Sequence, residues 1–203
     1  MPRTGLRGLG LAAIAAVVVL MAAPAAAASL QSDEFNAPVL DPAVWTFVDP
    51  LGDSTLGATG SHAVISVPAG QAHDMWASLD TAPRLLQATP NEDFEVEVKF
   101  DSAVTAGYQQ QGIVVQGTGG ALLRLELHSD GGGTKLFAAA IEPGSASVKH
   151  YAAVVGGAPA YLNVVRAGDA WTFRYSRDGA TWLETATFAH ALNVTAVGAF
   201  AGN

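Results

Sequence analysis

The sequence predicts an all-β protein, built as a two-sheet antiparallel sandwich. Short runs in which apolar and polar residues alternate follow one another along the chain, a pattern typical of half-buried strands. Glycine is frequent, with 22 residues, and turn residues separate the runs. Apolar spacing at the helical period is almost absent, apart from a short helix expected over residues 41–45.

The first residues have the features of a secretory signal peptide. Two arginines precede an uncharged apolar run from Leu9 to Met21, and Ala26 and Ala28 form a small-residue cleavage pattern. The alternative is a retained membrane anchor, but the run is shorter than the ~20 residues that span a bilayer. We expect a signal peptide over 1–28 and a secreted domain over 29–203, not embedded in a membrane after cleavage.

Composition excludes several classes of function. The chain has 18 acidic and 10 basic residues and a net charge of −8. This balance argues against nucleic acid, whose phosphates require a basic face, and against anionic membrane surfaces. There is no cysteine, so disulfides, thiol nucleophiles and cysteine-based zinc sites are excluded. The mature chain is long enough for one domain with its own core.

The cleanest strand pattern is Asp93–Phe100, in which apolar and polar residues alternate over eight positions. In Ala121–His128, we expect the leucines to point inward and Arg124, Glu126 and His128 to point outward. Strands at this spacing, with turns between them, favour a sandwich or a barrel. The other expected strands are His62–Val67, Pro83–Gln87, Gln111–Gln116, Lys135–Ile141, Val148–Val155, Tyr161–Arg166, Trp171–Ser176 and Thr181–Phe188.

Several short stretches, taken in order, resemble a known family. They are Ser32–Asn36 with Leu40–Trp45, Val67–Trp76, Ala82–Gln87, Asp93–Phe100, Gln109–Ile113 and Tyr175–Trp182. The chain resembles concanavalin A-like jelly-roll domains of the DUF1349 type, which are related to the C-terminal sandwich module of family 43 β-xylosidases. The resemblance spans nearly the whole mature chain. It implies two curved antiparallel sheets, with a concave face that can meet carbohydrate in related modules.

One departure from the family concerns the end of the chain. The resemblance implies a closing strand after Val197–Asn203, and the sequence stops at Asn203. We therefore expect a domain that lacks its closing strand, with one sheet edge open. We also expect the sequence to be a fragment, with further domains beyond Asn203.

Two acidic residues at the domain entry, Asp33 and Glu34, are a candidate structural calcium site. The resemblance implies carboxylates from the first and last strands around such an ion. Calcium takes six to eight oxygens, and the closing-strand partner is absent here. The alternative is a solvated pair of acids at the start of a strand.

The loop that ends in His73, Asp74 and Trp76 is the first candidate ligand site. A tryptophan offers a flat apolar platform for a sugar ring, and neighbouring Asp and His side chains supply directional hydrogen bonds. The alternative is that Trp76 belongs to the core, Asp74 caps a turn and His73 bonds locally.

A second candidate site consists of polar residues on neighbouring expected strands. Arg84 lies in an apolar run and needs a partner or an exposed position. Together with Gln110, Gln111, Arg124 and Glu126, it is expected to face one cleft. An outer polar face is the equally weighted alternative.

Glu95 and Glu97 are weak candidates for catalytic carboxylates. Same-face neighbours on a strand lie ~7 Å apart, near the ~6.5–9.5 Å separation of inverting glycosidases. The order of acids is D-x-E-x-E, unlike the E-x-D-x-E of the laminarinase-type family. A solvated outer face is the favoured interpretation of these residues.

Three functions remain open at this point. The first is a secreted, non-catalytic module that contacts carbohydrate or a wall polymer. The second is an accessory domain of a larger exported protein without a ligand of its own, and the third is a glycoside hydrolase that uses paired carboxylates. We rank them in that order.

Overall fold

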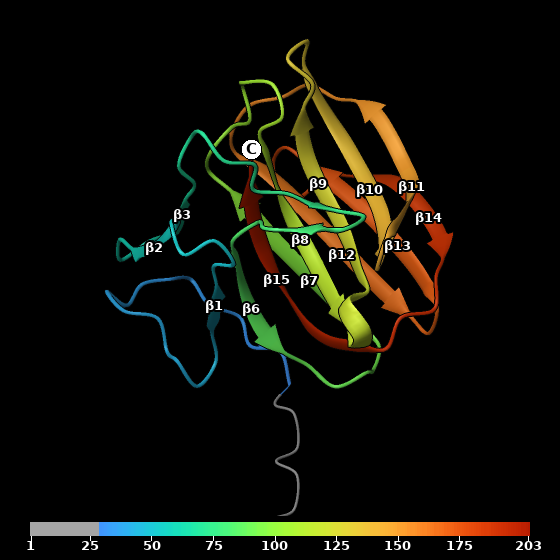
Figure 1. Cartoon of the computed structure of the whole chain (residues 1–203), viewed down its shortest axis with the longest axis horizontal. Coiled ribbons are helices and arrows are strands. Elements are labelled where there is room, and N and C mark those ends of the chain that lie inside the picture. Colours follow the sequence, from blue (N-terminus) through green and yellow to red (C-terminus); the bar gives the residue numbers. More distant parts are fainter. Residues whose placement is uncertain (1–28) are drawn as a thin grey trace, which may run out of the picture.

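The computed structural model describes residues 29–203 and confirms the all-β fold (Figure 1). The expected signal peptide, residues 1–28, lies outside the described residues. Within 29–203, no helix is long and apolar enough to cross a membrane. The helix expected over 41–45 is wrong, because these residues form a turn in which the Trp45 N–H donates to the Asp41 carbonyl at 2.8 Å.

The larger sheet has seven strands in the order β1-β6-β15-β8-β9-β10-β11, and all neighbours are antiparallel. A 3-10 turn, η1 (Thr118–Gly120), joins β8 to β9. The strands are β1 (Thr46–Val48), β6 (Arg84–Ala88), β15 (Val194–Gly202), β8 (Gln110–Gly117), β9 (Leu122–Ser129), β10 (Thr134–Glu142) and β11 (Ser145–Ala153).

The smaller sheet has four antiparallel strands in the order β14-β13-β12-β7. Two short hairpins, β2–β3 and β4–β5, complete the fold. The remaining bounds are β7 (Phe94–Phe100), β12 (Ala160–Ala167), β13 (Ala170–Ser176), β14 (Trp182–Ala189), β2 (Thr55–Ala58), β3 (Ala63–Ser66), β4 (Met75–Trp76) and β5 (Leu79–Asp80).

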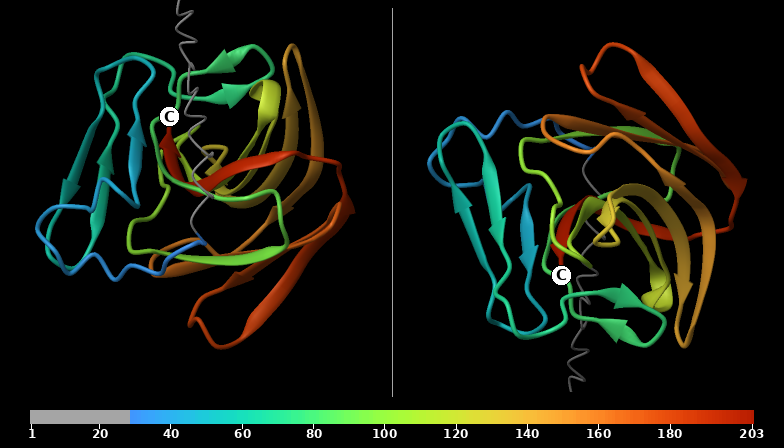
Figure 2. Two further views of the ribbon diagram at one scale, coloured as in Figure 1. Left: turned by 90° about the horizontal axis from the view of Figure 1, so that it is seen from below. Right: turned by 90° about the horizontal axis from the view of Figure 1, so that it is seen from above.

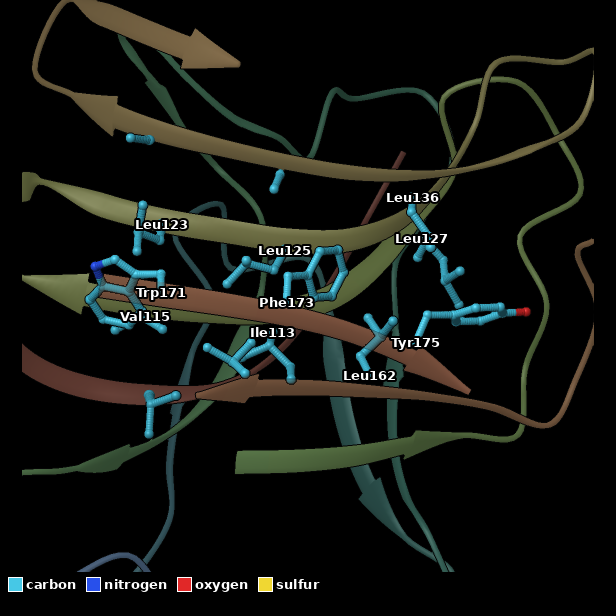
Figure 3. Packing of buried hydrophobic residues seen from close by; sticks show 14 of the residues in the cluster. Ile113, Val115, Leu123, Leu125, Leu127, Leu136, Leu162, Trp171, Phe173 and Tyr175 are labelled. Atoms are coloured by element: carbon cyan, nitrogen blue, oxygen red, sulfur yellow. The ribbon is translucent and has the colours of Figure 1, made fainter. Parts of the chain in front are cut away.

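The main core lies between the two sheets (Figure 3). It contains the inward-facing leucines of β9 together with the fully buried Trp171 and Phe173 of β13. The apolar residues of β7 pack against this cluster, as the alternation over Asp93–Phe100 predicts. The strand pattern in the sequence therefore identified the inward face of both sheets.

A second apolar cluster lies on the opposite face of the seven-stranded sheet. The β4–β5 hairpin lies over this face, away from the four-stranded sheet (Figure 2). The fully buried Met75 of the hairpin packs there with Val114, Ala139 and Phe200 of the sheet. The outward side of the large sheet is thus partly covered, and polar side chains on that side are buried.

Strand β15 lies in the middle of the large sheet, between β6 and β8. No strand was expected over these residues, because their many alanines and glycines weaken the alternation of apolar and polar side chains from which strands were predicted. A Cβ at Gly198 would lie 1.9 Å from the Leu85 carbonyl oxygen, so the close approach of β6 requires glycine there. Since β15 is hydrogen-bonded on both sides, it is not an edge strand. A further strand after Asn203 stays a prediction.

Candidate functional site

The candidate site lies on the outer face of the seven-stranded sheet, beside the β4–β5 hairpin. Antiparallel register places Gly112 of β8 opposite Glu126 of β9, and Val114 opposite Arg124. Arg124 and Glu126 therefore project on the same side as the second apolar cluster. Both side chains were expected on the outward face, either in a cleft or on an outer polar face. They do lie on the outward face, where they are buried: Glu126 is 0% exposed and Arg124 is 3% exposed.

Arg124 is the centre of a buried polar network. Its Nε donates to Glu126 Oε2 at 2.7 Å and its Nη2 donates to Glu126 Oε1 at 2.8 Å, a bidentate pair. Nη2 also donates to Gln110 Oε1. Nη1 donates to Asp74 Oδ1 at 2.6 Å and to the Met75 carbonyl at 2.7 Å. The network thus joins the hairpin to two central strands of the sheet.

Aromatic rings hold the guanidinium of Arg124 in place. The guanidinium carbon lies 5.5 Å from the Phe137 ring centre and 5.8 Å from that of Phe200. At these distances a cation is attracted to the face of the ring. Arg124 is consequently fixed by rings as well as by hydrogen bonds.

The charged groups of the network shift one another's pKa values. Burial raises the pKa of Glu126 to about 7, although the Arg124 guanidinium opposes the rise. Burial also acts to raise the pKa of Asp74, but Arg124 and Gln110 outweigh it, so the pKa of this carboxyl is lowered. Burial and the charge of Arg124 lower the pKa of His128. At neutral pH Arg124 is therefore positively charged and Asp74 is negatively charged.

A pocket of about 660 Å³ opens above this network. Its volume lies within the range of ~300–1,000 Å³ that is usual for small-ligand sites. Rings from four parts of the chain form its walls, and three of them are accessible: Tyr108 is 76% exposed, Tyr151 is 52% exposed and Trp76 is 37% exposed. Phe137 contacts two of these rings, with its ring centre 5.9 Å from that of Trp76 and 6.1 Å from that of Tyr151.

Further contacts close the β4–β5 hairpin and attach it to the sheet. The Thr81 N–H donates to the Asp74 carbonyl at 2.8 Å, which closes the base of the hairpin. Arg84, 5% exposed on β6, pairs with Asp80 of the hairpin through both of its terminal nitrogens. Arg84 therefore positions the hairpin, and it does not line the pocket.

His73 is fully buried and connects the loop before β4 to distant parts of the chain. Its Nε2 lies 2.9 Å from Asp53 Oδ1, and its Nδ1 lies 3.1 Å from both Asn203 Oδ1 and the Gln71 carbonyl. Burial lowers the pKa of His73, but its bonds to Asp53 and Asn203 outweigh this effect and raise it. The side chain thus braces the loop that carries Asp74 and does not itself line the pocket.

The other predicted site residues lie elsewhere. Gln111 points to the opposite face of its strand and bonds Ser102, with Nε2 donating to the Ser102 carbonyl at 2.7 Å. Glu95 and Glu97 lie on the solvent face of the four-stranded sheet, where Asn163 donates to Glu95 at 2.9 Å. These three residues do not line the pocket.

Both carboxylate oxygens of Asp33 accept hydrogen bonds from the protein. Oδ1 accepts from the Phe35 N–H at 2.7 Å and Oδ2 accepts from Trp45 Nε1 at 2.8 Å. Among residues 29–203, no three His, Asp or Glu side chains gather into a metal-binding group. Asp33 and Glu34 together provide fewer oxygen ligands than the six to eight that calcium takes. A calcium ion at this position stays a prediction.

Of the predicted ligand residues, the structure brings Asp74, Trp76 and Arg124 together at one pocket. Sequence reasoning missed the aromatic walls. A signal for them exists in β10, where Phe137 and Ile141 lie on one face and Leu136 on the other. A strand that is apolar on both faces indicates that both faces are covered.

These features define a concanavalin A-like β-sandwich with a pocket on the outer face of its larger sheet. Residues 32–203 match the family described as the β-xylosidase C-terminal concanavalin A-like domain. The chain belongs to this family. The expected relationship to the C-terminal module of family 43 β-xylosidases is confirmed, and the DUF1349 type stays a prediction.

Solved structures with the same fold come from several kinds of protein. A protein of unknown function from Saccharomyces cerevisiae is 18% identical with a TM-score of 0.65, and the match covers 79% of this chain and 88% of that one. The GH43 protein BlXynB from Bacillus licheniformis is 18% identical with a TM-score of 0.61, covering 84% and 35%. A GlcNAcα1-4Gal-releasing endo-β-galactosidase from Clostridium perfringens is 14% identical with a TM-score of 0.57, covering 86% and 56%.

The chain therefore spans about a third of the length of the GH43 protein, 35%. No curated protein matches the sequence. At these identities, the structural likeness establishes the fold alone.

Proposed function

We propose that this domain is a secreted, non-catalytic module that binds carbohydrate in the pocket between the β4–β5 hairpin and the seven-stranded sheet. The observation that carries the proposal is the pocket itself. Exposed rings form its walls, and a rigid buried network of Arg124, Glu126, Asp74 and Gln110 lies at its base.

The two parts of the pocket suit the two kinds of surface on a sugar. The C–H face of a pyranose packs against a flat aromatic ring, and the accessible Trp76, Tyr108 and Tyr151 offer such rings. Hydroxyl groups need polar partners held at fixed positions, which the network provides. Because Arg124 is already fixed by its partners, little side-chain freedom is lost when a ligand binds.

The family supports an accessory role. The matched family consists of C-terminal domains of β-xylosidases, and the GH43 protein is nearly three times the length that the match covers. A domain attached to a glycosidase that holds carbohydrate would keep the enzyme near its polymer. We expect a glycosidase domain in the same gene product, and sequencing of the complete gene tests this.

The alternative, a glycoside hydrolase that acts through Glu95 and Glu97, draws no support from the geometry. Both side chains lie on an exposed sheet face outside the pocket. If the alternative holds, Glu95→Gln and Glu97→Gln abolish release of reducing sugar from a polysaccharide panel.

Binding to polysaccharides tests the proposed function. Retardation in affinity gels and pull-down on insoluble polymers should show binding by the wild type and its loss in Trp76→Ala. Leu183→Ala is the matched control, because this exposed side chain lies on β14 of the other sheet. Circular dichroism verifies that both variants are folded. A folded Trp76→Ala protein with unchanged retention, or a wild type that binds no member of the panel, contradicts the proposal.

A further inference from the structure

The number of N–H groups that Arg124 has available limits which ligands this pocket can bind. A guanidinium has five N–H donors. In this protein all five have acceptors: Nε bonds Glu126, Nη1 bonds Asp74 and the Met75 carbonyl, and Nη2 bonds Gln110 and Glu126. The guanidinium therefore has no N–H left to grip a carboxylate or phosphate on a ligand.

Asp74 presents the opposite situation, with an acceptor to spare. Its Oδ1 accepts from the Met75 N–H at 2.8 Å, from Gln110 Nε2 at 3.0 Å and from Arg124 Nη1 at 2.6 Å. Within residues 29–203, no hydrogen bond reaches Oδ2, and the side chain is 32% exposed at the pocket. A carboxylate oxygen accepts hydrogen bonds and cannot donate them when ionised. Oδ2 of Asp74 can thus accept hydrogen bonds from a ligand, for example from the hydroxyls of a sugar.

The charges that face the pocket also disfavour an anion. Its charged and titratable lining consists of Asp74, Glu126, Arg124, His128, Tyr108 and Tyr151. Arg124 is already paired with Asp74 and Glu126, and burial and the charge of Arg124 lower the pKa of His128, which disfavours its cationic form. The nearby Lys135 pairs with Asp130 at 3.1 Å and does not line the pocket. A ligand carboxylate would meet like charge without a free cation to compensate.

We infer that the pocket selects uncharged sugar residues, whose hydroxyls donate to Oδ2 of Asp74, and that it rejects uronic acids. This inference rests on the proposed function and adds the class of ligand. Arg124 acts here as a positioning residue, because it fixes Asp74 and makes no bond of its own to the sugar. Selectivity arises in two ways: the site offers a hydrogen-bond acceptor to the hydroxyls of a neutral sugar, and it offers no free cation to the carboxylate of a uronic acid.

Matched pairs of ligands test the inference. Isothermal titration calorimetry would compare galacto-oligosaccharides with galacturonate oligomers, and gluco-oligosaccharides with their glucuronate-containing counterparts. We expect the neutral member of a binding pair to bind at least about tenfold more tightly. We also expect its affinity to change little with added salt, since no ion pair forms with the ligand. Equal or tighter binding of the acidic member overturns the inference.

Asp74→Asn distinguishes acceptor recognition from a general loss of shape. The amide can still accept from Arg124 through one atom and then turns a donor toward the pocket. We expect neutral-sugar affinity to fall at least about tenfold and the preference over the acidic member to shrink. Glu184→Gln, the same change of charge on exposed β14, is the control. An Asp74→Asn protein that is folded and keeps the full preference also overturns the inference.

The two proposals fail in different ways. If the wild type binds neither member of any pair, the proposed function and the inference both fail. If it binds sugars but prefers the acids, the pocket is a carbohydrate site and only the inference about its charge selectivity is wrong.

Discussion

Gly112 and Glu126 face each other across β8 and β9, and the glycine provides the space for the glutamate. A Cβ at Gly112 would lie 2.5 Å from the Glu126 Cβ and 2.4 Å from the Leu125 carbonyl oxygen. The absence of a side chain on one strand is therefore what allows a fully buried carboxylate on the next.

Gly112→Ala should destabilise the protein and disturb the pocket together. The added methyl meets backbone as well as side chain, so we expect a loss of about 3 kcal/mol in the free energy of unfolding. Displacement of Glu126 should also weaken saccharide binding. Denaturant titration measures the first effect and affinity gels the second. Gly57→Ala is the control, because a Cβ there meets nothing within 4 Å, and a similar loss in both variants would refute the explanation.

Glu126 should make the protein less stable as pH rises. Its pKa is about 7 in the folded protein against an ordinary value of 4.5, so the folded state holds its proton more tightly than the unfolded state. This contribution is fully present below pH 4.5 and is lost as pH rises through about 7. Its size is on the order of 3 kcal/mol.

Comparison with Glu126→Gln isolates this contribution from other titrating groups, including the nearby His128. Unfolding free energies measured from pH 4 to 8 should fall more steeply in the wild type than in the variant. Identical slopes would mean that Glu126 ionises with an ordinary pKa.

The two histidines paired with aspartates should differ sharply in their effect on stability. His73→Ala removes a fully buried side chain together with its bonds to Gln71, Asn203 and Asp53, and we expect a loss of about 2–4 kcal/mol. His62 makes a similar 2.9 Å contact with Asp101, but its side chain is 48% exposed. His62→Ala should therefore lose no more than ~1 kcal/mol. Denaturant titrations of the two variants make the comparison, and equal losses would argue against the bracing role of His73.

Asp178 should stabilise the β13–β14 turn in a pH-dependent way. Hydrogen bonds from the Thr181 and Ala180 N–H groups, at 2.7 and 2.9 Å, hold the pKa of this carboxyl well below its usual range. Its contribution is present above pH 3.8 and is lost as pH falls further. Asp178→Ala should lower the denaturation midpoint at pH 7 and flatten the loss of stability in acid. Asp169→Ala, which removes a carboxylate from the β12–β13 turn, is the comparison and should lower the denaturation midpoint at pH 7 less than Asp178→Ala does.

The sequence predicted strands well where one face meets the core and the other meets water. The alternation over Asp93–Phe100 identified β7 and its inward face, because that strand has one buried and one solvated side. The same rule placed Arg124 and Glu126 on the correct, outward face. It could not show that the β4–β5 hairpin and its neighbours cover this face and bury both side chains.

Local sequence patterns could not predict which residues meet at the pocket. Asp74 and Arg124 are 50 residues apart, and their contact depends on strand register and on how the hairpin lies over the sheet. Asp74 and Trp76 were found because they stand out chemically in a loop. Tyr108 and Tyr151 carried no such signal, since single aromatic residues are common in strands and turns.

The central position of β15 determines when the large sheet can form. Strands β6 and β8 come early in the chain, yet each has β15 as its neighbour, and β15 is made after every other strand of the sheet. During synthesis from the N-terminus, the β1–β6 pair and the β8–β11 strands therefore have no bridge between them until residues 194–202 leave the ribosome. The seven-stranded sheet can therefore be completed only after β15, the last of its seven strands in the chain, has been synthesised.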